Sequence, residues 1–484
     1  MGRYRKFRVI VRGDRRSGVS GPGTAPQPTR YAVGVASKKR GRAPGRQGKG
    51  LSGNPQRRAQ QLQERDAAGH LGQQPRRAGS VTPASGRTWP WWAESHETVL
   101  AQVRAAEWPS RLLDIEALAG RLAGDEFHAR VNAPGPGTGL NPTAWVQALT
   151  GTAADAMAAD LAAHGKDWPQ LWAFCCGLGD EESVEARAAE AAAIADRGFT
   201  PVPGVPVSWY QPTEGDDALV ARDAYGSRFL LVAPFSDRGQ PAVPDHWYAW
   251  DLDWCAVGLV VAAGAYGSAA DALAEWRTAV GPAAAAADLA PCPPELGIRL
   301  LEPALADFHQ ADSVLGDEPV EFFREVPRLF RRAAAVADSL GQILPRKRSS
   351  RLADGRDAAI ENFLDWQAGH AWNSPDARDA AEEALELILA EWGPDVPPDE
   401  RVFYACSPHR IETWATILRD LYEPDGVNKA LDLLPYWVQW CAARTALDAE
   451  CADRALTAAH AEADRKSTRL NSSHVLRSRM PSSA

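Results

Sequence analysis

The chain has 484 residues, enough for two or three domains, and its 45% hydrophobic and 24% charged residues are ordinary for a globular protein. Its net charge of −9 combines a basic start, with 20 basic and 3 acidic side chains in residues 1–90, and an acidic body, with 28 and 58 in residues 91–463. An acidic body repels nucleic acids and anionic lipid surfaces, and the longest apolar run, residues 255–266, is too short to span a bilayer. We therefore expect no membrane partner.

Residues 1–87 form a basic arm that we predict to be disordered. This stretch is rich in Gly, Pro, Gln and Arg and cannot bury enough apolar surface to offset the entropy of ordering. One interpretation places the natural start at Val35, read from an alternative start codon, with residues 1–34 as leader. A hypothesis of nucleic-acid binding through residues 35–87 rests on their positive charge. The absence of aromatic residues to stack on bases favours a solubilising or spurious tail instead.

The compartment is predicted from two features of the sequence. Seven cysteines, an odd number at irregular spacing, indicate free thiols in a reducing environment. Charged residues interrupt the apolar stretch within residues 7–16, so no secretory signal follows the basic N-terminus. We expect a cytoplasmic location.

Residues 88–200 are predicted to be a helical region that opens with TWPWW (88–92), which we expect to dock onto the core. Apolar residues at three- and four-residue spacing predict helices over 96–108, 109–124, 141–165 and 181–198. The adjacent Cys175 and Cys176 lie beside aromatic residues and are interpreted as core. The GPGTG stretch (135–139) is interpreted as a turn, because a phosphate loop would need a lysine and a preceding strand.

Residues 201–285 change character and are predicted to be a small α+β unit. Residues rich in β-branched and aromatic side chains predict two strands within 216–235, joined at 224–227, and one or two more within 245–261. In the latter, the alternation of a strand places Tyr248, Trp250, Leu252 and Trp254 on one face and Asp251 and Asp253 on the other. A helix should follow from a Ser268 cap to Gly281.

Residues 286–463, after a Pro-rich break, are predicted to form a helical bundle. Apolar stripes and Ser-Pro starts predict helices over 319–344, 374–393 and 407–421. Residues 426–447 are apolar on most faces and should be central, with Pro435 kinking that helix or marking its first turn. The predicted fold class is thus mainly α with an inserted small α+β unit, an antiparallel sheet plus a helix.

His246, Asp251 and Asp253 are the candidate site residues. Two carboxylates at positions i and i+2 of a strand point the same way, and with a histidine they could bind a metal or act as acid and base. The alternative is a solvent-facing polar row opposite an aromatic core row. We favour this alternative, because no partner motif of fixed spacing accompanies the three residues.

Other catalytic and binding signals are incomplete. Cys406 and His409 form a C-x-x-H, but no second pair completes a zinc site. The sequence contains no nucleophile elbow, Walker loop, dinucleotide-binding glycine pattern or H-E-x-x-H. We therefore expect no metal and no cofactor. A catalytic triad of residues distant in sequence stays open, because its members need not be adjacent.

Two resemblances add hints about the body. The segment LDLLPYWVQWCAARTAL (431–447) is similar to one that ends uncharacterised proteins of GC-rich actinobacteria, and the 45 arginines against 8 lysines fit a GC-rich genome. Residues 217–262 followed by GAYGSAADALAEW (264–276) resemble the small β-β-β-α unit of HicB-type antitoxins. That resemblance implies a fold for this stretch only, since a D-R-G-Q-P insertion and the tryptophans depart from the pattern.

Residues 464–484 are interpreted as an artefactual tail. The string DRKSTRLNSSH resembles one reading frame of a short-read sequencing adapter, and SRMPSSA resembles its next segment. The four apolar residues of this tail are too few and too scattered to form a face at helical or strand period. We expect it to make no packed contact with the body.

Three hypotheses of function remain. The leading one is a non-enzymatic protein-binding scaffold, motivated by an acidic body with 18 tryptophans and no catalytic motif, since tryptophan is enriched at binding hot spots. The second is a hydrolase-like or metal-dependent enzyme with a site around His246, Asp251 and Asp253. The third is nucleic-acid binding through the basic arm.

Overall fold

The computed structural model describes residues 91–132, 142–163, 165–179, 210–215, 217–237, 242–255, 258–305, 320–341, 351–368, 375–393 and 397–477. The basic arm, the GPGTG stretch and the helix expected over 181–198 lie outside these ranges. Residues 93–484 belong to one compact unit and residues 16–92 to another. Of the second unit only Trp91 and Trp92 are described, with their rings edge to face at 6.3 Å. The docking of TWPWW stays a prediction.

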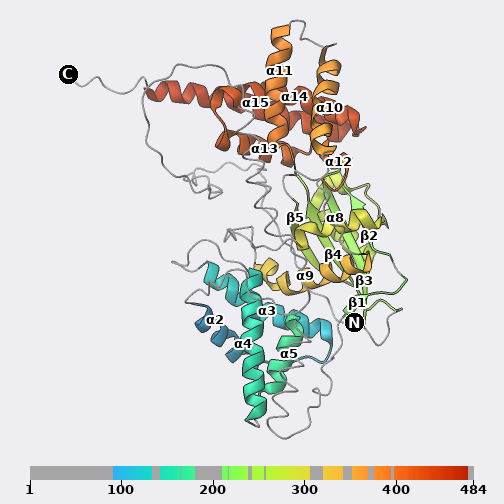
Figure 1. The fold of residues 1–484 in the computed structure, drawn as a ribbon, viewed down its shortest axis with the longest axis vertical. Coiled ribbons are helices and arrows are strands. Elements are labelled where there is room, and N and C mark those ends of the chain that lie inside the picture. Colours follow the sequence, from blue (N-terminus) through green and yellow to red (C-terminus); the bar gives the residue numbers. More distant parts are fainter. Residues whose placement is uncertain are drawn as a thin grey trace, which may run out of the picture. The chain divides into compact units, whose positions relative to one another are not determined.

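The N-terminal helices are α2 (Trp92–Ala105), α3 (Leu112–Val131), α4 (Pro142–Ala162) and α5 (Trp168–Leu178) (Figure 1). Both Cys175 and Cys176 are buried on α5, as predicted. Helix α3 approaches a later helix, α9 (Val320–Ser339), very closely. At Gly124 an added Cβ would lie 2.5 Å from the backbone nitrogen of Arg324, so only glycine permits this separation.

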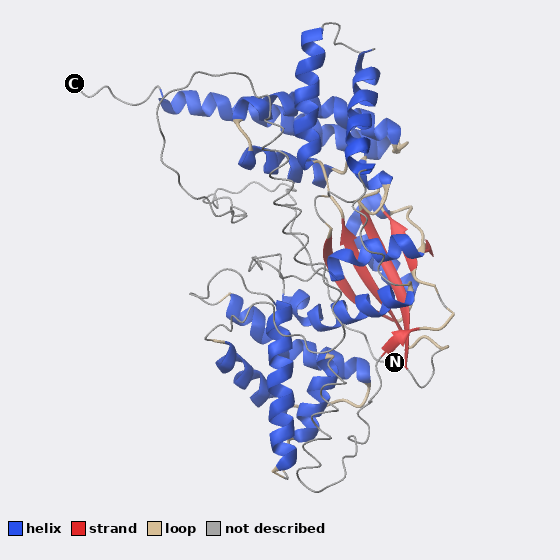
Figure 2. Cartoon of the chain, viewed as in Figure 1, coloured by secondary structure: helices blue, strands red, loops and turns tan. Residues whose placement is uncertain are grey.

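A single antiparallel sheet follows, drawn in red in Figure 2. Its strands are β1 (Tyr210–Pro212), β2 (Leu219–Arg222), β3 (Arg228–Asp237), β4 (His246–Asp253), β5 (Leu259–Tyr266) and β6 (Ala290–Pro291). The order is β5-β4-β3-β2-β6, and β1 also pairs with β3. In the central pair, Leu231 faces Trp250. The turn predicted at 224–227 joins β2 to β3, and the second predicted stretch is two strands, β4 and β5.

Helices cover both faces of the sheet. On one face, Tyr248, Trp250 and Leu252 pack with residues of α8 (Pro294–Leu305) and α9. On the other face, Leu230 and Val232 pack against α7 (Ala269–Val280), which Ser268 caps as predicted by accepting a hydrogen bond from the Asp271 amide. Helices α8 and α9 were assigned by sequence to the C-terminal bundle. Their apolar stripes do not reveal which partner they cover, and in the structure that partner is the sheet.

The C-terminal helices are α10 (Arg351–Ala368), α11 (Pro375–Glu391), α12 (Glu400–Phe403), α13 (Pro408–Leu421), α14 (Pro424–Arg444) and α15 (Ala449–Arg477). Their core contains Trp392, which meets the rings of Trp414 and Trp437 edge to face at 5.8 and 5.9 Å. Pro435 lies inside α14, well past its first turn, which excludes the first-turn interpretation. Helix α15 carries its backbone through Arg477, into the segment interpreted as an adapter tail.

The fold class predicted from the sequence is therefore confirmed for the described residues: mainly α, with a small antiparallel sheet and its helix. Among the same residues, no helix combines the length and the apolar character that crossing a bilayer requires.

Candidate functional site

The three candidate residues on β4 do not form one site. His246 begins the strand and shares the face of Tyr248 and Trp250, whereas Asp251 and Asp253 lie on the opposite face. Five residues of strand also separate His246 from Asp251 by roughly 16 Å. A single metal or acid–base centre therefore cannot use all three side chains in this arrangement.

Asp251 is fully engaged in structural contacts. Arg228 donates two hydrogen bonds to its carboxylate, from Nε at 2.8 Å and from Nη2 at 2.6 Å, and the Trp276 indole donates a third at 3.0 Å. Burial opposes the charge of Arg228, but Asp251 raises its pKa. The interpretation of Asp251 and Asp253 as a solvent-facing row is wrong, because α7 covers this face of the sheet and both residues are buried.

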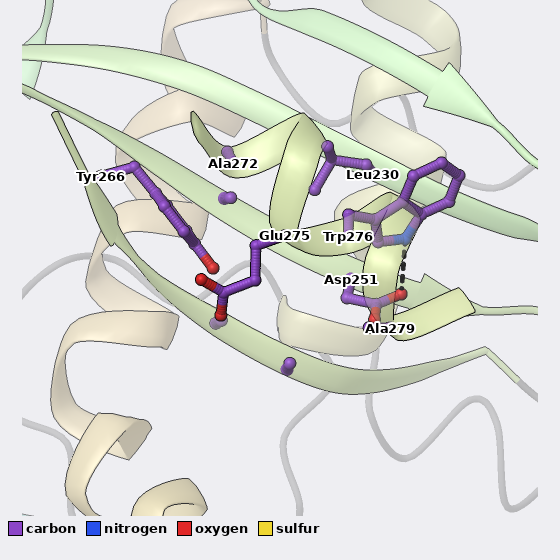
Figure 3. Close-up of a pocket in the computed structure, with 10 residues that line it drawn as sticks. Leu230, Asp251, Tyr266, Ala272, Glu275, Trp276 and Ala279 are labelled. Atoms are coloured by element: carbon purple, nitrogen blue, oxygen red, sulfur yellow. Dashed lines mark hydrogen bonds between the residues drawn. The ribbon is translucent and has the colours of Figure 1, made fainter. Parts of the chain in front are cut away.

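A cavity of about 30 Å³ adjoins Asp251 beneath α7 (Figure 3). Tyr266 and Glu275 line it and point toward each other, and burial raises the pKa of Tyr266. A volume of this size holds about one water molecule. The face of Asp251 is thus a place for a buried water and has no room for a substrate.

Asp253 lies in a second cluster that joins β4 to the start of α13. Its Oδ1 accepts from the Cys255 amide at 2.7 Å, and its Oδ2 lies 3.7 Å from Nε2 of His409, the histidine of the C-x-x-H. The Cys255 thiol sits between the hydroxyls of Ser227, at 3.3 Å, and Ser407, at 3.1 Å. Sequence analysis missed this cluster because Cys255 and Ser407 are 152 residues apart.

The thiols of this cluster are poor nucleophiles. Burial raises the pKa of Cys255 to about 12 and that of Cys406 to about 12, so both stay protonated near neutral pH. Ser407 is committed as the cap of α13, where it accepts from the Arg410 amide. No group of three or more potential metal ligands occurs among the residues that the structure describes. The cluster therefore acts as a joint in the fold.

Arg410 completes this joint. It is fully buried, and its guanidinium donates to four main-chain carbonyl groups: Cys255 at 2.8 Å, Trp254 at 2.6 Å, Val402 at 2.6 Å and Ala405 at 2.9 Å. All three nitrogens of the guanidinium are engaged. Arg410 thereby ties the end of β4 to the segment before α13.

His246 belongs to a third cluster, at the other end of β4. Its ring stacks on Phe235 at 5.7 Å and meets Tyr210 edge to face at 4.4 Å. Its Nδ1 lies 3.3 Å from Oδ2 of Asp245. Burial lowers the pKa of His246 to about 4, so the ring is neutral near pH 7. Its Nε2 is buried without a hydrogen-bond partner in the described part of the chain.

Helix α9 brings buried arginines to the same cluster. The guanidinium of Arg332 lies 4.8 Å above each of the Tyr210 and Phe235 rings, and its Nη2 donates to Glu116 of α3 at 2.8 Å. Arg331 also pairs with Glu116. Burial opposes ionisation of Glu116, but Arg332, Arg331 and Arg328 lower its pKa.

One turn earlier on α9, Arg328 pairs with Glu325, whose Oε2 accepts from the Tyr248 hydroxyl at 3.1 Å. Sequence analysis missed these charges as site residues. The available signal was that Glu325, Arg328 and Arg332 share a helix face with apolar residues such as Leu329 and Val336, which places charges where burial is expected.

A groove on the surface of α14 and α15 is the largest hollow near these elements. It has a volume of about 400 Å³ and is lined by Asp432, Pro435, Tyr436, Gln439, Leu456, His460 and Ala463. The ring of Tyr436 is 39% exposed there, which is unusual for a large apolar side chain in this fold. No sequence motif marked the groove, because it forms only when the two helices pack.

Comparison with protein-family models, with curated proteins and with solved structures gave no match. The function must therefore be argued from the clusters and the groove themselves.

Proposed function

We propose that the chain is a non-enzymatic protein-binding scaffold and that the groove between α14 and α15 accepts a cationic amphipathic helix of its partner. The groove itself is the observation that carries this proposal. Its volume of about 400 Å³ lies within the range of ligand pockets. Its floor combines Pro435, Tyr436 and Leu456, which suits an apolar helix face.

The charge of the partner follows from the rim of the groove. Asp432 on α14 and Asp453 and Asp464 on α15 are exposed, and the spacing of Asp453, Leu456, His460 and Asp464 places them on one face of α15. The body as a whole is strongly acidic. Lysine or arginine residues flanking the apolar face of a partner helix would complement these carboxylates and speed association.

The tryptophans do not carry this proposal. Trp145, Trp172, Trp250, Trp392, Trp414 and Trp437 are all almost fully buried and serve as core. The exposed aromatic residue that can serve as a hot spot is Tyr436, because tyrosine is also enriched where truncation weakens binding.

The enzyme hypothesis is less well supported by the geometry. Its candidate carboxylate Asp251 is held by Arg228 and Trp276, and His246 lies on the other face of the sheet. Nucleic-acid binding would rest on residues 35–87, outside the described ranges. The seven cysteines are all free and buried, which supports the proposal of a reducing, cytoplasmic setting.

The test places a photo-crosslinking benzoylphenylalanine at position 436 of the full chain, identifies the captured protein, and measures its affinity by calorimetry. We expect Tyr436→Ala to weaken binding at least about tenfold, which corresponds to about 1.4 kcal/mol. Added salt should weaken it further.

The matched control is Leu421→Ala, because Leu421 is 59% exposed and does not line the groove. Equal affinities of Tyr436→Ala and Leu421→Ala for the captured protein would refute the groove as the binding site.

A further inference from the structure

We propose that the cluster of His246, Arg332 and Glu116 binds one hydrogen phosphate ion between α9 and the sheet. This site is separate from the groove on α14 and α15. The argument rests on unpartnered nitrogen atoms, on the balance of charge and on the tautomer of His246.

The first observation is a set of buried nitrogens with no partner in the described part of the chain. They are Nε and Nη1 of Arg332, Nε of Arg328 and Nε2 of His246. Arg332 is fully buried and His246 is 1% exposed. These two side chains pack on the same two rings, Tyr210 and Phe235, so their free nitrogens share one environment. Buried donors are nearly always satisfied, so a bound species is expected here.

The second observation is an excess of positive charge. Three guanidinium groups, Arg328, Arg331 and Arg332, meet only two carboxylates, Glu116 and Glu325. Burial raises the pKa of Glu325, which favours its neutral form and increases the excess. The nearby pair of Arg111 and Asp245 is balanced at 3.0 Å and adds no net charge. An anion compensates this charge, whereas a water molecule does not.

The third observation selects the anion. Hydrogen bonding from His246 lowers the pKa of Asp245, so Asp245 is an ionised acceptor and Nδ1 of the neutral ring carries the proton. Nε2 of His246 is then an acceptor. The ligand must accept hydrogen bonds from Arg332 and donate one to His246. Hydrogen phosphate does both, whereas sulfate has no proton to donate near pH 7.

The test measures the melting temperature of the full chain, purified without phosphate, in phosphate, sulfate and chloride at matched ionic strength and at pH 7. Sulfate is the matched control, because it shares the general stabilising effect that excluded anions have on folded proteins. We expect phosphate to raise the melting temperature by several degrees more than sulfate, with saturation as the concentration rises. An equal response to phosphate and sulfate would overturn the proposal.

Two substitutions locate the site. His246→Phe keeps the ring stack and removes Nε2, and Arg332→Lys keeps the charge and removes Nη1; each should abolish the difference between phosphate and sulfate. Arg410→Lys is the control, since Arg410 is equally buried but fully bonded to carbonyl groups, and it should retain the difference.

Should the variants fail to fold, calorimetric titration of the unaltered chain with inorganic phosphate still decides. Saturable binding near one ion per chain that excess sulfate does not displace supports the site. An absence of binding heat together with an unchanged melting temperature overturns it.

Discussion

Substituting Gly124 of α3 by alanine should destabilise the protein by about 2 kcal/mol. The new Cβ would lie 2.5 Å from the Arg324 nitrogen and 2.7 Å from the Phe323 carbonyl carbon, both backbone atoms of α9. Ordinary contact distances are roughly 3.5–4.0 Å, so α9 must move by about 1 Å. Overpacking of this kind costs about 1–3 kcal/mol. The higher helix propensity of alanine offsets up to about 1 kcal/mol of a cost near the upper end.

The assay is thermal unfolding of the full chain followed by circular dichroism. For a domain of ~150–250 residues, 2 kcal/mol corresponds to a loss of roughly 4–8 °C. The control is Gly151→Ala on α4, where an added Cβ meets nothing within 4 Å. That substitution should raise stability by about 0.4–1 kcal/mol. A Gly124→Ala chain as stable as the Gly151→Ala chain would refute the close approach of α3 and α9.

Three further outcomes are expected. Asp251→Asn leaves the buried Arg228 without its counter-ion and should cost roughly 3 kcal/mol by urea denaturation, whereas a loss under 0.5 kcal/mol would contradict the buried pair. The pKa of about 4 for His246 lies below its unfolded value, so the unfolded chain binds more protons and stability should fall as pH falls from about 6.5 to 4. His246→Phe should remove roughly 3 kcal/mol of that loss, and an unchanged pH profile would count against a buried neutral ring. Deleting residues 466–484 should leave the melting temperature unchanged, and a drop of several degrees would show that the segment packs on the body.

Local patterns predicted the elements of this fold well because each element carries its own period. The alternation in 245–253 predicted the row of Tyr248, Trp250 and Leu252 that packs under α8 and α9. Ser268 and Ser407 were recognised as caps because capping depends on residues only three positions away.

The same patterns failed where partners are distant in sequence. Asp251 alternates like a surface residue, and only the placement of α7 shows that it is buried. Strand β6 is two residues long and lies in a Pro-rich stretch that has no strand signal of its own. It is defined by its pairing with β2, about 70 residues earlier, which no local window contains.

The candidate site was predicted less well than the fold, for a related reason. Asp253 and His409 were each noted, in separate motifs, but their approach to 3.7 Å depends on the packing of α13 against the end of β4. Arg410, fully buried and bonded to four carbonyl groups, gave no signal at all, since a single arginine in an amphipathic helix is ordinarily a surface residue.

The close approach of α3 and α9 and the charges between them depend on each other. Glu116 reaches Arg331 and Arg332 because Gly120 and Gly124 remove the side chains that would hold the helices apart. Glycine lowers helix stability by about 1 kcal/mol at each position, so the contact must return more than that. An α9 shifted by about 1 Å would move Arg332 relative to Tyr210 and Phe235. Gly124→Ala should therefore reduce the phosphate-dependent rise in melting temperature as well as the melting temperature itself, whereas Gly151→Ala should alter only the latter.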